Sequence, residues 1–240
     1  MSDRPAMLAL AKDVAGRRIL DAGYGSGSLS AALRDGGAVV TGIDASAGML
    51  ALARRRRLDD DVALHVVDLS DRLPYADGAF DDVVASLVLH YLEDRGPTLA
   101  DLRRVLRPGG RLIASVNHPF VAYTIQDPRP DYFATTSYTF DWTFNGQSVP
   151  MRFWRKPLHA MTDAFTAAGF RQLLQGTGQV TEVEIAENRQ ALRQRAPGPL
   201  HIRARGRSPR IGGLPRTGGA AGAGAAAGAG TRRAGRSADR

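Results

Sequence analysis

The sequence predicts an α/β fold, in which a doubly wound, mostly parallel sheet carries helices on both faces. Strand-like segments alternate with helix-like segments along the first 170 residues. The strand-like segments are continuous apolar runs rather than period-two alternations, which is typical of parallel strands that are buried on both faces. Glycine pairs and Pro-Gly steps mark the boundaries between segments. The alternation therefore predicts a parallel sheet covered by helices.

The first elements follow from composition and punctuation. Residues 6–15 are rich in alanine and leucine and stop at Gly16, which predicts a short helix. The β-rich run at residues 18–22 predicts the first strand. Residues 28–34 predict a second helix, which a pair of glycines ends.

Three strands and a helix come next. Residues 38–43 and 64–67 are apolar runs that predict the second and third strands, and residues 82–89 predict a fourth with continuous apolar character. Ser46 suits the N-cap of a helix that reaches about Arg57.

A Pro-Gly-Gly step separates the next helix from the next strand. Pro97 fits the first position of a helix, and three leucines follow on one face before residues 108–110 end it. Residues 111–116 predict the fifth strand. Residues 157–168 form an amphipathic stretch, which predicts a last helix that ends at Gly169.

The motif with the clearest chemistry follows the first strand. Residues 21–27 read Asp-Ala-Gly-Tyr-Gly-Ser-Gly and lead into a helix. Glycines allow a ligand to approach the backbone, and amides at a helix start favour an electron-rich group. Asp44 ends the second strand, 21 residues after Gly23, where an acid can accept hydrogen bonds from ribose hydroxyls. A nucleoside ligand is the favoured interpretation, and a packing turn is the alternative.

The spacing disfavours two common nucleotide cofactors. The dinucleotide fingerprint is Gly-x-Gly-x-x-Gly. Here the third glycine comes one position early, and Ser28 stands where that fingerprint needs glycine. No phosphate-binding loop ending in Gly-Lys-Ser/Thr is present either. We therefore expect neither NAD nor ATP.

These motifs resemble those of class I S-adenosylmethionine-dependent methyltransferases, and most of all the small-molecule branch related to quinone-biosynthesis methyltransferases (methyltransferase type 11-like). The resemblance covers about residues 4–170 and implies a Rossmann-like fold. Six segments carry it in the right order: residues 19–27, 42–46, 68–69, 73–81, 86–92 and 106–110.

The resemblance implies S-adenosylmethionine as the cofactor and assigns residues to it. Gly23, Gly25 and Gly27 would line its methionine end, and Asp21 before them is a further cofactor-binding residue. Asp44 would hold the ribose, and Met49 or Ala45 would lie near the adenine. Asp68 would accept from the adenine amino group, the Leu69 amide would lie beside it, and Ser86 would face the sulfonium. Asp68 could instead cap a turn. Tyr24 departs from the family, which usually has cysteine or another small residue there.

Aromatic residues gather after the fifth strand. Ten of the sixteen in the chain lie between residues 117 and 154, and the alternation in residues 138–144 suggests a hairpin that turns at Asn145-Gly146. We predict a lid over about residues 117–154 that holds an apolar or aromatic acceptor. Its candidate residues are Phe120, Tyr123, Tyr132, Phe133, Trp142 and Trp154. A cap with its own small core is the alternative.

Methyl transfer is an in-line displacement, in which the enzyme aligns the nucleophile, excludes water and can remove a proton. A base should lie where the fourth or fifth strand ends. His118 and His90 are the candidate catalytic residues, because an imidazole is a suitable proton acceptor near pH 7. A structural role for each histidine is the alternative.

The positive charge of the chain is concentrated at its end. The formal net charge is +8, and residues 204–240 contribute +7 of it through eight arginines and one aspartate. This stretch has too few apolar side chains to offset the entropy of ordering it. We expect one methyltransferase domain over residues 1–203 and a disordered tail over residues 204–240.

Composition and charge also bound the function. The chain has no cysteine, which excludes a disulfide scaffold, a thiolate metal site and a cysteine nucleophile, and no metal is expected. No signal pattern or membrane span is visible, so we expect a cytoplasmic protein. The expected partner is a small-molecule methyl acceptor rather than nucleic acid. Two alternatives stay open: a cofactor-binding protein with little or no turnover, and an RNA methyltransferase that uses the basic tail.

The resemblance ends beyond Phe170. Residues 173–175 and 180–185 are candidates for one strand, and residues 200–203 for another. Because shifted GC-rich DNA reads as arginine, alanine, glycine and proline, we hypothesise a frame change in the gene near residue 171. A natural extension is the alternative, and resequencing the gene distinguishes the two.

Overall fold

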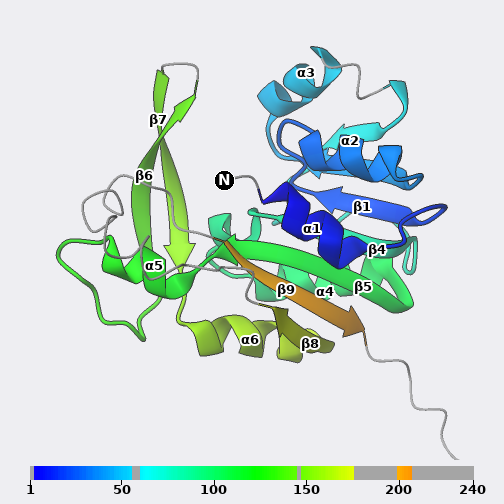
Figure 1. Cartoon of the computed structure of the whole chain (residues 1–240). Helices are drawn as coiled ribbons and strands as arrows, with labels where there is room; N and C mark the ends of the chain where they lie inside the picture. The colour runs from blue at the N-terminus through cyan, green and yellow to red at the C-terminus, as the bar shows by residue number, and fades with distance from the viewer. Residues whose placement is uncertain (1–2, 56–59, 145–146, 176–198, 207–240) are drawn as a thin grey trace, which may run out of the picture. The chain divides into compact units, whose positions relative to one another are not determined.

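A seven-stranded sheet forms the centre of the protein (Figure 1). The structure, a computed structural model, describes residues 3–55, 60–144, 147–175 and 199–206, with only the backbone for residues 142–144, 147, 172–175 and 199–206. The strand order is β3-β2-β1-β4-β5-β9-β8. The strands are β1 (Arg18–Ala22), β2 (Val39–Asp44), β3 (Ala63–Val66), β4 (Phe80–Ser86), β5 (Leu106–Asn117), β8 (Phe170–Gln175) and β9 (Pro199–Gly206).

The first five strands are parallel, and the last two are antiparallel. β1 pairs in parallel with both β2 and β4, so the order of the sheet reverses direction at β1. β9 pairs antiparallel with β5, and β8 pairs antiparallel with β9. The predicted doubly wound, mostly parallel sheet is confirmed.

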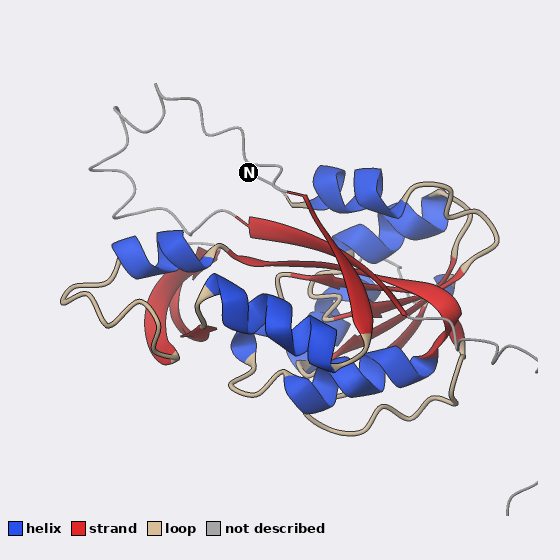
Figure 2. Cartoon of the chain, turned by 90° about the horizontal axis from the view of Figure 1, so that it is seen from below, coloured by secondary structure: helices blue, strands red, loops and turns tan. Residues whose placement is uncertain are grey.

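Helices cover both faces of the sheet (Figure 2). One set is α1 (Arg4–Ala11), α2 (Ser28–Asp35) and α3 (Ala47–Arg55), and the other is α4 (Gly96–Val105) and α6 (Leu158–Ala167). Each set has its own core. None of the helices in the described residues is long and apolar enough to cross a membrane.

Neighbouring residues along each strand supply the two cores alternately. Ile19 packs with α1 and α2, whereas Leu20, the next residue, belongs to the cluster of α4 and α6. Val84 and Val83 divide in the same way on β4. Successive side chains of a strand point to opposite faces, so only a continuous apolar run can fill both cores.

Several element boundaries differ from the expected ones. α1 begins at Arg4 and ends at Ala11 rather than spanning residues 6–15. β4 ends at Ser86, and a 3-10 turn, η2 (Leu89–Tyr91), follows it. The Pro-Gly-Gly step lies inside β5, because Leu106 already pairs with Phe80 and the register then shifts before Arg111 pairs with Asp82.

The region after β5 also holds an unexpected helix, α5 (Pro119–Thr124), and then the hairpin of β6 (Thr136–Phe144) and β7 (Gln147–Arg155). The hairpin was predicted, and its turn residues lie outside the described residues. β8 begins at Phe170, earlier than expected, and β9 extends past the expected residues 200–203 to Gly206. The candidate strand at residues 180–185 lies outside the described residues. The expected tail also lies outside them, except for residues 204–206, which belong to β9.

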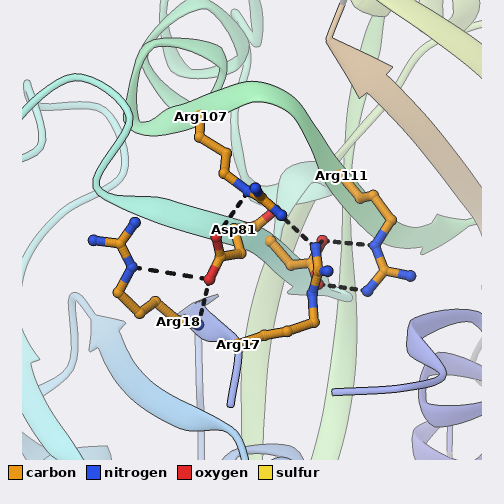
Figure 3. Close-up of polar contacts among 6 residues, drawn as sticks. Arg17, Arg18, Asp81, Arg107 and Arg111 are labelled. Carbon is orange, nitrogen blue, oxygen red and sulfur yellow. Dashed lines mark hydrogen bonds and ion pairs between the residues drawn. The ribbon is translucent and has the colours of Figure 1, made fainter. Parts of the chain in front are cut away.

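Charged side chains gather at the amino ends of β1, β4 and β5 (Figure 3). The buried Asp82 receives hydrogen bonds from two guanidinium groups: Arg17 donates through Nε and through Nη2 (2.8 Å), and Arg111 donates through Nε (2.6 Å). The neighbouring Asp81 pairs at the surface with Arg107, whose Nε lies 2.7 Å from Oδ1. This cluster joins three strands at the edge opposite to the predicted ligand site.

Candidate functional site

The predicted cofactor residues lie at the carboxyl ends of the parallel strands. β1 leads into the glycine loop of residues 23–27, β2 ends at Asp44, and β4 ends at Ser86. The order of the sheet reverses between β1 and β4. Ligands of open α/β sheets bind outside the carboxyl ends of the strands at such a switch point.

The glycine loop needs glycine for two different reasons. Gly23 has φ +81°, and a Cβ there would lie 2.5 Å from Cγ2 of Val88. Gly25 has φ +55°, but a Cβ there would meet no atom within 4 Å. The backbone at Gly25 is therefore open on the side where a side chain would otherwise project, as the approach of a ligand requires.

Asp44 joins the glycine loop to the end of β2. Its Oδ2 accepts a hydrogen bond from the Gly25 amide at 2.9 Å, and its Oδ1 accepts one from the Ser46 amide at 2.9 Å. Each carboxylate oxygen can accept a further bond. The exposed Ala45 lies between β2 and α3, and the exposed Met49 lies in the first turn of α3.

Asp21 is a buried carboxyl group with one oxygen unpaired. Its exposed fraction is 1%, and Oδ2 accepts a hydrogen bond from Ser30 Oγ at 2.6 Å. Its Oδ1 has no partner within the described part of the chain. Burial raises the pKa of Asp21 to about 7, and the charge of Asp44 acts in the same direction. An unpaired buried carboxyl oxygen fits a site whose ligand supplies a donor or a positive charge.

The pKa of Asp21 makes stability depend on pH in a testable way. Folding favours the protonated acid, so this contribution to the free energy of unfolding is complete below the unfolded pKa of about 3.9. It is lost as the pH rises through about 7. We expect Asp21→Asn, which imitates the protonated acid, to remove this decline. Urea unfolding between pH 4 and 8 measures it, and equal slopes for both proteins would contradict the assignment.

Asp68 and Leu69 follow β3 at the same edge. Oδ1 of Asp68 accepts hydrogen bonds from the amide and the hydroxyl of Ser70, and these bonds lower the pKa of Asp68. Asp68 thus caps a turn, as the alternative interpretation holds, and its role toward adenine stays a prediction. The Leu69 side chain is buried, and its carbonyl accepts a hydrogen bond from Thr98.

Ser86 contacts a residue that the sequence analysis did not identify. Its hydroxyl donates to Oδ2 of Asp3 at 2.7 Å, and the hydroxyl of Ser115 on β5 donates to the same oxygen at 2.6 Å. Ser115 pairs in register with Ser86, and its hydroxyl also accepts from the Leu87 amide. Ser115 lies near the end of the predicted fifth strand, and this position could have identified it as a site residue. Nothing in the sequence around Asp3 could have done so, because it lies far from both serines in the chain.

Neither candidate catalytic histidine is in the form of a good base. His90 is buried, and this burial, followed by the charge of Arg95, lowers the pKa of His90 to about 3. His118 caps α5, where Nδ1 accepts a hydrogen bond from the Phe120 amide at 3.2 Å. An imidazole whose Nδ1 accepts a bond carries its proton on Nε2. A catalytic role for either histidine stays a prediction.

Four of the six predicted lid residues form one aromatic group, and a second group, centred on Phe153 of β7, contains none of the six. In the first group, ring contacts link the candidates Phe120, Tyr123, Tyr132 and Phe133, with centroids 5.3–6.2 Å apart. In the second, Phe153 packs against His90, Tyr91 and Tyr138. Of the other two predicted lid residues, Trp154 has the guanidinium of Arg152 over its ring. Trp142 is a residue of β6, and only its backbone is described.

A hollow of about 330 Å³ lies beside this region. Residues 125–128, after α5, and residues 138–140, on β6, line it. Its volume is within the range of small-molecule sites.

Comparison with known proteins supports the resemblance. Residues 20–114 match a family described as a methyltransferase domain. The chain is 43% identical over 100 residues to a demethylmenaquinone methyltransferase of Beutenbergia cavernae, which covers 42% of this chain and 40% of that protein. It is 38% identical over 111 residues to a malonyl-[acyl-carrier protein] O-methyltransferase of Serratia marcescens, covering 45% of this chain and 42% of that protein. The chain spans about two fifths of the length of these relatives.

Solved structures share the fold. A putative S-adenosylmethionine dependent methyltransferase from Listeria monocytogenes has a TM-score of 0.66 at 21% identity and covers 86% of this chain and 97% of its own. A Burkholderia thailandensis 1,6-didemethyltoxoflavin-N1-methyltransferase with bound S-adenosylhomocysteine has a TM-score of 0.56 at 20% identity, covering 86% and 80%. The Rossmann-like fold that the sequence predicted is confirmed.

Proposed function

We propose, from the methyltransferase domain at residues 20–114, that the chain transfers a methyl group from S-adenosylmethionine to a small apolar or aromatic acceptor. One observation carries the proposal: a single carboxylate, Asp44, holds the open glycine loop at the switch point of the sheet. Asp21 supports it, because its unpaired oxygen at the same edge suits a cationic ligand.

The residues at this edge fit the parts of the cofactor. Asp44 has acceptor capacity for the ribose hydroxyls, and the open backbone at Gly25 leaves room beside it. Asp21 would face the methionine end, and Ala45 and Met49 would lie near the adenine. When bound, the cofactor supplies a carbon that its sulfonium activates toward nucleophiles. The protein positions the acceptor in line and excludes water from the site.

The lid residues would hold the acceptor. The hollow beside β6 lies next to the aromatic side chain of Tyr138, which also stacks on Phe153. The named relatives suggest two acceptor classes for a first screen: a demethylated menaquinol and a malonyl thioester. Release of S-adenosylhomocysteine in that screen distinguishes an enzyme from a protein that only binds the cofactor.

Calorimetry with S-adenosylhomocysteine tests the cofactor site. We expect micromolar binding to the wild type and a loss of about tenfold or more for Asp44→Asn, because hydrogen bonds to a charged group contribute about 1.5–3 kcal/mol. Asn keeps one acceptor oxygen, which can serve the Gly25 amide of the glycine loop. Asp35→Asn, which removes an exposed carboxylate at the end of α2, is the matched control and should bind as the wild type. Absence of binding to the wild type would refute the proposal.

The two roles of His118 can be separated by two substitutions. His118→Ala should lower the free energy of unfolding by about 1 kcal/mol, because it removes the N-cap of α5. His118→Asn keeps a side-chain acceptor and should preserve stability. If the histidine is a base, both variants lose turnover in the acceptor screen. If it only caps the helix, His118→Asn retains turnover.

A further inference from the structure

A small cavity with an unusual charge lies at the lid end of β5. Its volume is about 10 Å³, which is room for one water-sized group. Three cations, Arg95, Arg155 and Lys156, line it together with Asn117, Tyr138 and Trp154. No acid is among the described residues that line it.

Arg95 is a buried cation for which none of the described carboxylates serves as a counter-ion. Its exposed fraction is 3%, and its guanidinium donates through Nε to the Leu89 carbonyl (2.8 Å) and through Nη2 to the Trp154 carbonyl (3.1 Å). Within the described ranges, no carboxylate forms an ion pair with it. Burial lowers the pKa of Arg95 to about 10, so the group stays charged near pH 7. A buried charge with no opposite charge is costly in a folded protein.

The other two cations differ in how they are held. Arg155 is buried and donates to the carbonyls of Asp131, Tyr132 and Ala134, so its hydrogen bonds fix the loop before β6. Lys156 is half-buried, and its burial, followed by the charge of Arg95, lowers the pKa of the ammonium. Asp94 and Glu93 act on Lys156 in the opposite direction, but both are exposed and neither lines the cavity. Arg95 and Lys156 therefore repel each other across a cavity that no described carboxylate lines.

Two neutral side chains that line the cavity, Asn117 and Tyr138, carry hydrogen-bond donors. Asn117 Nδ2 donates to the Tyr138 hydroxyl at 3.3 Å. Burial raises the pKa of Tyr138, so the phenol keeps its own proton. Two cations, an amide and a protonated phenol make a set that stabilises a negatively charged oxygen.

We propose that this cavity binds the anionic end of the methyl acceptor, a carboxylate or a phosphate oxygen. The inference rests on the proposed function for its location, because Asn117 ends β5 two residues after Ser115, at the edge of the cofactor site. Tyr138 lines both this cavity and the hollow of about 330 Å³. The cavity thus receives the charge, and the hollow receives the body of the acceptor. A structural tie between η2 and β7 accounts for the two carbonyl contacts of Arg95, but not for Lys156 beside it.

Fluorescence of Trp154 reads this site directly. The chain has two tryptophans, so Trp142→Phe leaves Trp154 as the sole reporter. Phenylacetate and phenyl phosphate are the anionic probes, and phenylacetamide is the neutral counterpart of the first. We expect at least one anion to bind about tenfold or more tightly than the amide, as charge-assisted hydrogen bonds require. The tighter of the two anions identifies the acceptor group as carboxylate or phosphate.

Variants in the same background assign the effect to the cavity. Lys156→Met should weaken the anion by about tenfold and leave the amide unchanged, and Arg95→Met should abolish the preference if it folds. Arg129→Met, which removes an exposed lid cation that lines neither space, is the matched control and should change nothing. An equal affinity for anions and amide, or an equal loss in Lys156→Met and Arg129→Met, would overturn the proposal.

The titrations are run with and without S-adenosylhomocysteine, whose own binding is measured by calorimetry. If the protein binds the anionic probes but does not bind S-adenosylhomocysteine, the proposed function is refuted and the anion site stands. If the protein binds S-adenosylhomocysteine but shows no preference for anions over the amide, the anion site is refuted and the proposed function stands.

Discussion

Gly23→Ala is expected to lower the free energy of unfolding by about 3–5 kcal/mol and to weaken S-adenosylhomocysteine by about 100-fold or more. Two physical costs combine at this position. A residue with a Cβ at φ +81° is strained by about 1–3 kcal/mol. The new methyl group would also lie 2.5 Å from Cγ2 and 2.7 Å from Cβ of Val88, and overpacking of this kind costs about 1–3 kcal/mol.

The clash has a cofactor consequence because of where Gly23 lies. Its amide donates to the Ile43 carbonyl at 2.7 Å, next to Asp44. A shift of Gly23 away from Val88 therefore moves the loop relative to the carboxylate that holds it. Chemical denaturation and calorimetry measure the two effects.

Gly25→Ala is the matched control for this prediction. Its φ is also positive, but its Cβ would meet no atom within 4 Å. Only the strain remains, and we expect a loss of about 1–2 kcal/mol in stability. The double variant Gly23→Ala with Val88→Gly removes every atom of the clash and should be less destabilised than the sum of its single changes. Equal losses for Gly23→Ala and Gly25→Ala would contradict the contact with Val88.

The sequence predicted the strands of the sheet because their signals are local. Residues 18–22 form β1 with the bounds expected, and residues 82–86 of the strand expected at 82–89 lie in β4. Local signals for α5 were present as well, since Pro119 occupies its first turn and the His118 side chain accepts a hydrogen bond at its N-cap. These signals were overlooked because the many aromatic residues of this region were interpreted as a lid. The Pro-Gly-Gly step was misread as a boundary because glycine and proline end helices more often than they lie within strands.

The contacts that the sequence could not show join residues far apart in the chain. Asp3 reaches Ser86 and Ser115 across 83 and 112 positions. Arg95 is a charged residue in a polar stretch, which predicts exposure, yet the carbonyls of η2 and β7 enclose it. The motif residues could be identified because their spacing in the sequence indicates their chemistry. Asp3 and Arg95 could not be identified, because only the packing of the folded chain brings them to their partners.

Asp82→Asn is the second large effect, and its target is the amino-terminal edge of the sheet. We expect a loss of about 3–5 kcal/mol in the free energy of unfolding, because removal of one partner leaves buried charges uncompensated. Asp82 is fully buried, and Arg111 beside it is 8% exposed. Asp81→Asn is the matched control: its partners Arg18 and Arg107 are half exposed, so its loss should stay below about 1 kcal/mol.

The pH dependence of unfolding provides an independent measurement of the same ion pairs. Burial alone would raise the pKa of Asp82, but hydrogen bonds from Arg111 and Arg17 outweigh burial and lower this pKa below its ordinary value. The stability that these bonds contribute is therefore present above the unfolded pKa of about 3.9 and is lost as the pH falls through the lower, folded value. Urea midpoints below pH 4 should fall steeply in the wild type and less steeply in Asp82→Asn. A variant that keeps the wild-type slope in acid, or that loses no more stability than Asp81→Asn at pH 7, would show that the cluster does not hold the three strands together.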